Sequence, residues 1–254
     1  MQIFGIELCR IILAAVLIFL VVKRANIVAF FAKRQFSKGN IEKAVKIFNI
    51  ASKVGNLNVA NRIVYGYLLL RSGQVDDALV ELRGALPMTK PDSADRYQIK
   101  NFTAIAYWKQ GNLKYAIEEL EEVTETGFKN TRIYENLGIL YNLGDDKEKA
   151  LRFNEEAYEY NSDDNIIADN YADALAICGQ FEESAKVYKE LISRDPEPRF
   201  PEAYYGYGRV LIELGERETG IQMIEKSLTK IFSFLSIKTK EEIEEMLKEI
   251  KKDT

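Results

Sequence analysis

Histidine is absent from the 254 residues of this chain, and only two cysteines and five prolines are present. Without histidine there is no Ser-His or Cys-His catalytic arrangement and no His-ligated metal site. Two cysteines cannot form a disulfide framework or a four-thiolate zinc site. Lys and Arg (35) nearly balance Asp and Glu (39), and the net charge of −4 disfavours non-specific binding of nucleic acid. With 15 glycines and 47% apolar residues, the composition predicts an ordered, mostly helical chain.

One long apolar run is present, near the start of the sequence. Residues 11–22 carry no polar side chain, and the window 3–22 holds only Glu7 and Arg10 as charges. About 20 mainly apolar residues are enough to cross the hydrocarbon core of a bilayer. Glu7 and Arg10 are three residues apart on one helical face, so they can neutralise each other. We predict a transmembrane anchor with a basic flank over residues 1–24, embedded through residues 3–22.

Two other interpretations of this segment stay open. One is a buried helix of a soluble protein, although the run is apolar all round and ends abruptly at Lys23 and Arg24. The other is a cleaved signal peptide. Such a peptide carries positive charge before its apolar stretch and small residues at its cleavage site, whereas here the charge follows the stretch.

Basic residues are concentrated immediately after the apolar run. Residues 23–62 hold nine Lys or Arg and one acidic residue, a net charge of +8, and residues 1–22 sum to zero. Since the whole chain is at −4, residues 63–254 carry −12. The positive-inside rule therefore predicts a short outside N-terminus and a cytoplasmic bulk. No Gly or Pro lies between residues 22 and 37, so we expect the membrane helix to continue unbroken into the next helix, over about 50 Å.

Two series of small residues run through the rest of the chain. One occupies positions 44, 78, 116, 150, 184 and 220, with spacings of 34, 38, 34, 34 and 36. The other stands 12 residues earlier each time, at 32, 66, 104, 138, 172 and 208. Antiparallel helices that cross closely need small residues at the crossing, and the glycine five residues before most members of the first series suits a helix C-terminus with positive φ. The pattern predicts a repeated helix-turn-helix unit.

The period and these positions resemble the tetratricopeptide repeat (TPR) family over residues 25–230. The fourth unit is closest to the family pattern, through Tyr134, Leu137, Gly138, Tyr141 and Ala150. The resemblance implies an all-α fold, a right-handed α-solenoid of about six helix-turn-helix units. We place these units at about 25–54, 58–86, 94–126, 130–160, 164–194 and 199–230. The family's frequent tryptophan is missing from the first helices, and the first unit matches least because Gln35 stands where an aromatic residue or leucine is usual.

Residues 231–254 no longer follow the repeat. Thr239 and Glu242 form a capping-box pattern, which opens a helix with an apolar stripe of Ile243, Met246, Leu247 and Ile250. A repeat array exposes its last apolar face unless something covers it. We therefore predict a C-terminal capping helix over 239–252, which helps to bury Phe232, Phe234 and Leu235. A partner-binding helix is the alternative.

The resemblance also implies a partner-binding groove along the first helices of the units. By register, its residues are Tyr67, Asn101, Phe102, Ile105, Lys109, Arg132, Asn136, Ile139, Asn170, Asp173, Tyr205 and Arg209. Some family members bind extended peptides through groove asparagines, and Asn136 and Asn170 lie 34 residues apart; solvated helix surface is the alternative for these amides. The family's clamp on a peptide carboxylate is disfavoured, because Asp169, Asp173 and Glu135 make the groove acidic. We expect a ligand of basic or mixed charge.

No constellation of catalytic residues is evident. There is no Gly-rich phosphate loop, and the acidic clusters at 118–122 and 241–245 are most simply solvated helix faces. We predict a non-enzymatic scaffold or adaptor, tethered to the membrane, that binds a protein or peptide partner. We expect no cofactor, metal, nucleic acid or small-molecule substrate. The alternatives are an extracytoplasmic (envelope) assembly or secretion factor with the opposite orientation, and an enzyme subunit or weak hydrolase.

Overall fold

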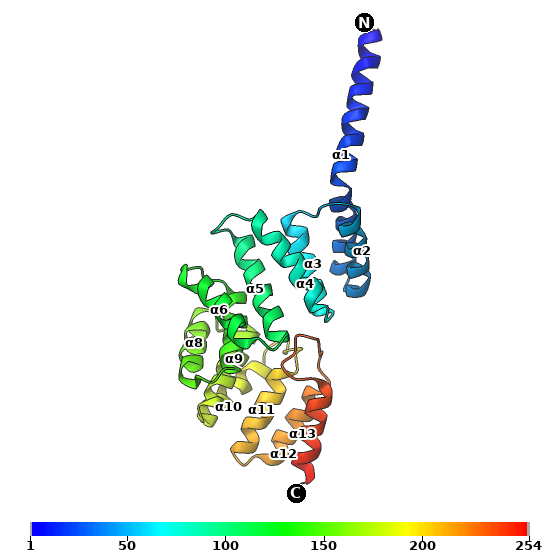
Figure 1. The fold of residues 1–254 in the computed structure, drawn as a ribbon. Helices are drawn as coiled ribbons and strands as arrows, with labels where there is room; N and C mark the ends of the chain where they lie inside the picture. Colours follow the sequence, from blue (N-terminus) through cyan, green and yellow to red (C-terminus); the bar gives the residue numbers. More distant parts are fainter. Residues whose placement is uncertain (1, 253–254) are drawn as a thin grey trace. The chain divides into compact units, whose positions relative to one another are not determined.

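The computed structural model describes residues 2–252, with side chains from residue 10 onward. Every regular element in this part of the chain is helical, as the composition predicts (Figure 1). The elements are α1 (Gln2–Ser37), α2 (Ile41–Val54), α3 (Val59–Arg71), α4 (Val75–Ala85), the 3-10 helix η1 (Leu86–Met88), α5 (Ala94–Lys109), α6 (Leu113–Glu125), α7 (Thr131–Asn142), α8 (Lys147–Tyr160), α9 (Asn165–Ile177), α10 (Phe181–Ile192), α11 (Glu202–Glu213), α12 (Arg217–Ser227) and α13 (Lys240–Lys252).

The chain forms two compact units, Met1–Phe102 and Thr103–Thr254. In the first, α1 packs with α2 and α3 with α4. In the second, α7 packs with α8, α9 with α10, and α11 with α12, and successive pairs also contact each other. Helical hairpins that each pack on the next form an all-α solenoid, which confirms the predicted fold class.

The turns inside the hairpins follow one pattern. Five glycines just after the first helices have positive φ, at Gly39, Gly73, Gly111, Gly179 and Gly215. The Gly73 amide donates to the carbonyl of Leu70 (3.0 Å), and the next amide, of Gln74, donates to that of Leu69 (2.9 Å). These bonds satisfy carbonyls that the helix end leaves free, and L side chains rarely adopt this φ. The predicted helix-ending role of these glycines is confirmed.

The small residues lie where helices cross, as the spacing predicts. A Cβ added at Gly208 would lie 2.6 Å from the carbonyl oxygen of Gly220, and one at Gly220 would lie 2.6 Å from that of Gly208. A Cβ at Gly66 would lie 2.6 Å from Cγ of Leu82. The backbones of α11 and α12 are therefore in direct contact, and this contact requires glycine on both sides.

Helix α1 runs without a break from Gln2 to Ser37, so the expected continuity is observed. Residues 10–24 are exposed, whereas Ala25, Ala29 and Ala32 are fully buried. The boundary is held by polar contacts. Arg24 Nε donates to the Val54 carbonyl, and Asn26 Oδ1 accepts from the Asn58 amide (3.0 Å). In the described part of the chain, α1 over Arg10–Ser37 is the one helix long and apolar enough to cross a membrane, a test that an N-terminal signal sequence also meets.

Helix α13 covers the last hairpin through Ile243 and Leu247, which pack in one cluster with Tyr205 and Ile224. The predicted capping box is present, since the Thr239 amide donates to Glu242 Oε2 (2.6 Å) and the Glu242 amide donates to Thr239 Oγ1 (3.2 Å). Phe232 packs against the same cluster. The expectation for Phe234 is wrong, because this ring is 42% exposed and lies beside the Lys109 ammonium instead.

Candidate functional site

Five of the twelve predicted groove residues line one cavity of about 260 Å³ within the second unit. They are Ile139 from α7, Asn170 and Asp173 from α9, and Tyr205 and Arg209 from α11. A second hollow of about 400 Å³ shares Asp173 and Arg209 and extends toward the N-terminus of α8. The register of the repeat therefore brings residues from three successive first helices to one place.

The other seven predicted residues do not line this cavity. In the first unit, the Tyr67 ring stacks on the Phe102 ring with centroids 5.0 Å apart, and Asn101 is almost fully buried. In the second unit, Ile105 is buried and Arg132 is exposed. Lys109 and Asn136 are partly buried. These residues belong to the packing or to other parts of the surface.

Helix α9 supplies three polar side chains of the cavity, Asp169, Asn170 and Asp173. Its N-cap is Asp164, whose Oδ1 accepts from the amides of Ile166 (2.9 Å) and Ile167 (3.0 Å). The helix contacts α7, α8, α10 and α11. Asp169 and Asp173 are four residues apart, so both carboxylates lie on the helix face that borders the cavity.

The asparagine amides are used inside the protein. Asn170 is almost fully buried, and its Nδ2 donates to the Glu135 carbonyl at 2.7 Å. Asn142 donates to the Asn170 carbonyl (2.9 Å) and to Asp173 Oδ2 (3.2 Å), and Asn154 donates to Asn142 Oδ1 (2.8 Å). One of the two Nδ2 hydrogens of Asn170 is therefore used inside the protein. Its amide ties α9 to α7.

Asp169 is a buried acidic residue of the cavity. It is 6% exposed, and its Oδ1 accepts no hydrogen bond from the described residues. Burial raises the pKa of Asp169 well above its ordinary value, and the nearby Glu202 and Asp173 carboxylates raise it further. Burial also raises the pKa of Asp173, while the Arg209 guanidinium acts in the opposite direction. The predicted acidic character of the groove is thus concentrated at α9.

Sequence reasoning missed one wall of the cavity. Ile237 and Lys238, from the segment between α12 and α13, line it together with Ile243. Glu202 Oε1 accepts from the Ile237 amide at 2.9 Å, and Lys109 Nζ donates to the Ser236 carbonyl at 2.8 Å. Burial lowers the pKa of Lys109. Since these partners lie 35 and 127 residues apart in sequence, no local spacing points to them.

Tyr188 and Gly206, also missed, close the floor of the cavity. Tyr188 is fully buried, and a Cβ added at Gly206 would lie 2.2 Å from its hydroxyl oxygen. Only glycine at position 206 leaves room for this phenol. Gly206 itself was the sequence signal that could have indicated this close contact, since it is a second glycine two residues before the repeat position Gly208.

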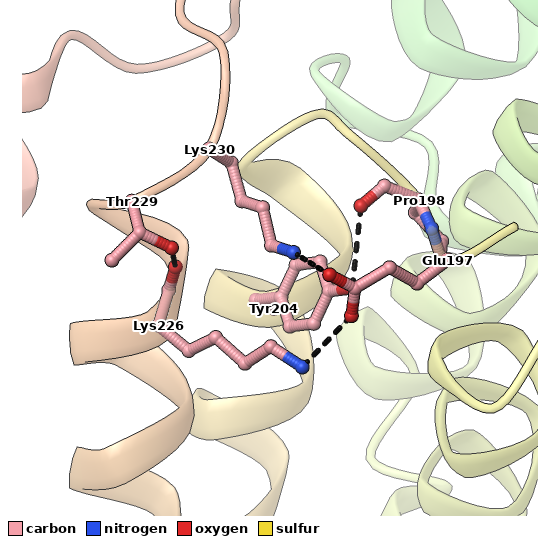
Figure 2. Close-up of polar contacts among 6 residues, drawn as sticks. All are labelled: Glu197, Pro198, Tyr204, Lys226, Thr229 and Lys230. Atoms are coloured by element: carbon pink, nitrogen blue, oxygen red, sulfur yellow. Dashed lines mark hydrogen bonds and ion pairs between the residues drawn. The ribbon is translucent and has the colours of Figure 1, made fainter.

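A separate ionic cluster holds the proline-containing loop before α11 (Figure 2). Glu197 accepts from Lys230 (2.7 Å), Lys226 (2.9 Å) and the Tyr204 hydroxyl (2.9 Å). These three hydrogen bonds lower the pKa of Glu197 to about 2. Lys230 Nζ also lies 4.1 Å from the centroid of the Tyr204 ring. The cluster fastens the loop to the end of α12, and its carboxylate is already fully engaged.

Among the described residues, no group of three or more His, Cys, Asp or Glu side chains is placed to hold a metal ion. Helices α9 and α11 present carboxyl groups, an amide, a phenol and a guanidinium to the cavity. This arrangement can bind a group by charge, hydrogen bonds and apolar contact.

Comparison with known structures gives the same architecture. A TPR protein from Parabacteroides merdae ATCC 43184 superposes with a TM-score of 0.71 at 15% identity, over 90% of this chain and 85% of that one. The pilF protein of Pseudomonas aeruginosa gives a TM-score of 0.61 at 15% identity, over 81% and 91%. YrrB, described as a TPR protein with an unusual peptide-binding site, gives 0.50 at 20% identity, over 78% and 93%.

No curated protein matches the sequence. Two family models do, and both are described as tetratricopeptide repeat. The second covers residues 172–222. The first covers residues 59–195, more than half of the chain, and the helical hairpins described above are the repeats it represents. This chain therefore belongs to the tetratricopeptide repeat family.

Proposed function

We propose that this protein is a non-enzymatic scaffold, tethered to the membrane by α1, that binds a protein partner along the first helices of its repeats. The cavity between α7, α9 and α11 is the observation that carries the proposal, because it collects five residues of the predicted groove. TPR arrays generally act as scaffolds for protein or peptide partners. YrrB, which has a similar structure, is described as having an unusual peptide-binding site. A stiff array loses little conformational entropy when it binds a partner.

The membrane tether is supported by the exposed apolar half of α1. Residues 11–22 carry no polar side chain and remain exposed although α1 continues into the packed first hairpin. Exposing such a surface to water is unfavourable, whereas it suits a bilayer. The net charge of +8 over residues 23–62 favours a cytoplasmic array.

Topology is the first test. Single cysteines at Lys252 and Gln2 are introduced into a Cys9→Ser, Cys178→Ser background, and intact cells are treated with a membrane-impermeant thiol reagent. We expect Lys252→Cys to be labelled only after lysis and Gln2→Cys to be labelled in intact cells. Labelling of Lys252→Cys in intact cells would contradict the orientation and favour an extracytoplasmic assembly or secretion factor. Release of the chain by carbonate washing would contradict the tether.

Partner binding is tested by a photo-crosslinking amino acid placed at Arg209, which lines the cavity and is exposed. The matched control is Tyr115 on α6, which is 62% exposed and lines neither hollow. We expect one polypeptide to be captured from Arg209 and not from Tyr115. Equal capture at both positions, or none at Arg209, would count against binding in this groove.

A further inference from the structure

We infer that the cavity between α7, α9 and α11 receives a basic side chain, lysine or arginine, of the partner polypeptide, and that the Asp169 carboxylate is its acceptor. The inference rests on the proposed function, since it names the chemistry of the partner at the same groove. It assigns a specific anchor residue where the sequence indicated only a groove of acidic character.

The first argument is the cost of leaving Asp169 as it stands. The carboxyl is 6% exposed and accepts no hydrogen bond at Oδ1, so this oxygen loses its hydration without compensation. The charged groups that act on it most strongly are Glu202 and Asp173, both of the same sign. A cation supplied from outside would compensate Asp169, the carboxyl of the three whose Oδ1 has no hydrogen-bond partner.

The second argument is that the nearby cations of the chain already have partners. Arg209 faces Asp173 and lies 5.8 Å from the centroid of the Tyr205 ring. Lys109 donates to the Ser236 carbonyl. Lys238 also lines the cavity, and the pKa of Glu242 is lowered by its hydrogen bond with the Thr239 amide and, less strongly, by the nearby Lys238 ammonium. Each therefore has its own electrostatic partner, and Asp169 is left without one.

The third argument is the size and lining of the cavity. At about 260 Å³ it lies just below the range of pockets for drug-sized ligands, which suits a single side chain. Ile139, Ile177 and Ile243 offer apolar contact on its walls. An aliphatic stem ending in a cation matches apolar walls around a buried carboxylate.

Binding of a cation must also displace a proton. Burial and like charges raise the pKa of Asp169, so the empty cavity keeps this group protonated to higher pH than usual, and a bound cation favours the ionised form. Affinity is therefore expected to rise with pH. The other titratable or charged groups that face Asp169 are Asp173 on α9, Tyr188 on α10, Glu202, Tyr205 and Arg209 on α11, and Lys238 on the connecting segment.

The test uses the full chain in detergent micelles with isotope-labelled isoleucine δ1-methyl groups. Four isoleucines line the cavity and report on it directly: Ile139, Ile177, Ile237 and Ile243. The probes are N-acetyl-lysine amide and N-acetyl-arginine amide, and the neutral control is N-acetyl-norleucine amide. We expect saturable shifts of these methyl signals with at least one cationic probe, at least 10-fold tighter than with norleucine, and tighter at pH 8 than at pH 6.

The variant arm compares Asp169→Asn with Asp145→Asn, an exposed aspartate beside the turn before α8. Asp169→Asn should weaken the cationic probe at least 10-fold and reduce the pH dependence of its binding, while Asp145→Asn should leave both unchanged. Equal binding of norleucine to the unaltered chain would overturn the inference without any variant. So would unaltered binding by Asp169→Asn, or the absence of any shift.

The outcome is separable from that of the proposed function. If the cationic probes fail but a photo-crosslinker at Arg209 still captures one partner, the groove binds protein and the assignment of Asp169 is wrong. If the probes bind but no partner is captured at Arg209, the cavity takes cations and the scaffold proposal is wrong.

Discussion

Single glycines in this chain serve two distinct purposes. At Gly39, Gly73 and Gly111 the backbone turns with positive φ. At Gly208 and Gly220 the reason is proximity, because each stands where an added Cβ would meet the other's carbonyl oxygen at 2.6 Å. A backbone atom cannot move aside as the end of a flexible side chain can. Substitutions at the two kinds of glycine therefore have different physical costs.

Gly208→Ala tests the second kind. The new methyl group must push α11 away from α12, and overpacking of this sort costs about 1–3 kcal/mol. We expect a correspondingly lower urea midpoint. The matched control is Gly55→Ala, whose Cβ would meet Ala25 Cβ at 3.4 Å, an ordinary contact, in an extended backbone conformation. If Gly208→Ala were as well tolerated as Gly55→Ala, the close backbone approach would be refuted.

At the scale of elements, the helices at the two ends of the described chain have opposite surroundings. The first half of α1 leaves apolar side chains exposed, whereas α13 places its apolar stripe on the last hairpin and turns its charged side chains outward. The difference lies in their neighbours. Among the side chains of α1 that the structure describes, the first buried one is Ala25, while α13 meets Tyr205 and Ile224. A cap of this kind protects the open end of a repeat array.

Ile243→Ala tests the capping role of α13. Ile243 is 1% exposed, and removing a buried isoleucine to alanine costs about 2–5 kcal/mol. Because repeat arrays are stabilised by neighbouring units, we expect hydrogen exchange to accelerate first in α12 and α13. The control is Glu245→Ala on the exposed face of the same helix, which should change little. Uniform acceleration throughout the second unit would contradict a local capping role.

At the scale of the whole molecule, buried carboxyl groups govern how stability depends on pH. Burial raises the pKa of Glu135 to about 7, with Asp164 acting in the same direction, and also raises the pKa of Asp169, Asp173 and Glu202. Their pKa values in the folded state lie above those in the unfolded state. The stability they contribute is therefore full below the unfolded pKa and is lost as pH rises through the folded pKa.

The expected outcome is a fall in the free energy of unfolding from pH 5 to pH 8. For Glu135 alone, the window from 4.5 to about 7 corresponds to about 1–3 kcal/mol after allowing for solvent screening. Glu135→Gln keeps a donor near Asp164 and should flatten this part of the profile, measured by urea unfolding at each pH. The exposed control Glu245→Gln should leave the profile unchanged. A profile that rises toward pH 8 would contradict the burial of these carboxyls.

Much of the architecture follows from local pattern. Helices form where apolar residues recur every three to four positions, turns form at glycines that accept positive φ, and hairpins close where small residues stand 12 apart. These rules act over a few residues, so they can be read directly from the order of the chain. The continuity of α1 and the capping box at Thr239 were predictable for the same reason.

The candidate site was predictable only in part. Register placed Ile139, Asp173 and Tyr205 on first helices that meet, and these residues do line one cavity. The partner of each side chain depended on packing between distant segments. Asn170 Nδ2 donates to the carbonyl of Glu135, 35 residues away in sequence, and Lys109 Nζ donates to that of Ser236, 127 residues away. The spacing of residues along a helix sets the face on which a side chain lies. Burial and pairing of side chains arise only when separate segments pack together. The lack of a hydrogen-bond partner for Asp169 Oδ1 was therefore decided by the tertiary structure.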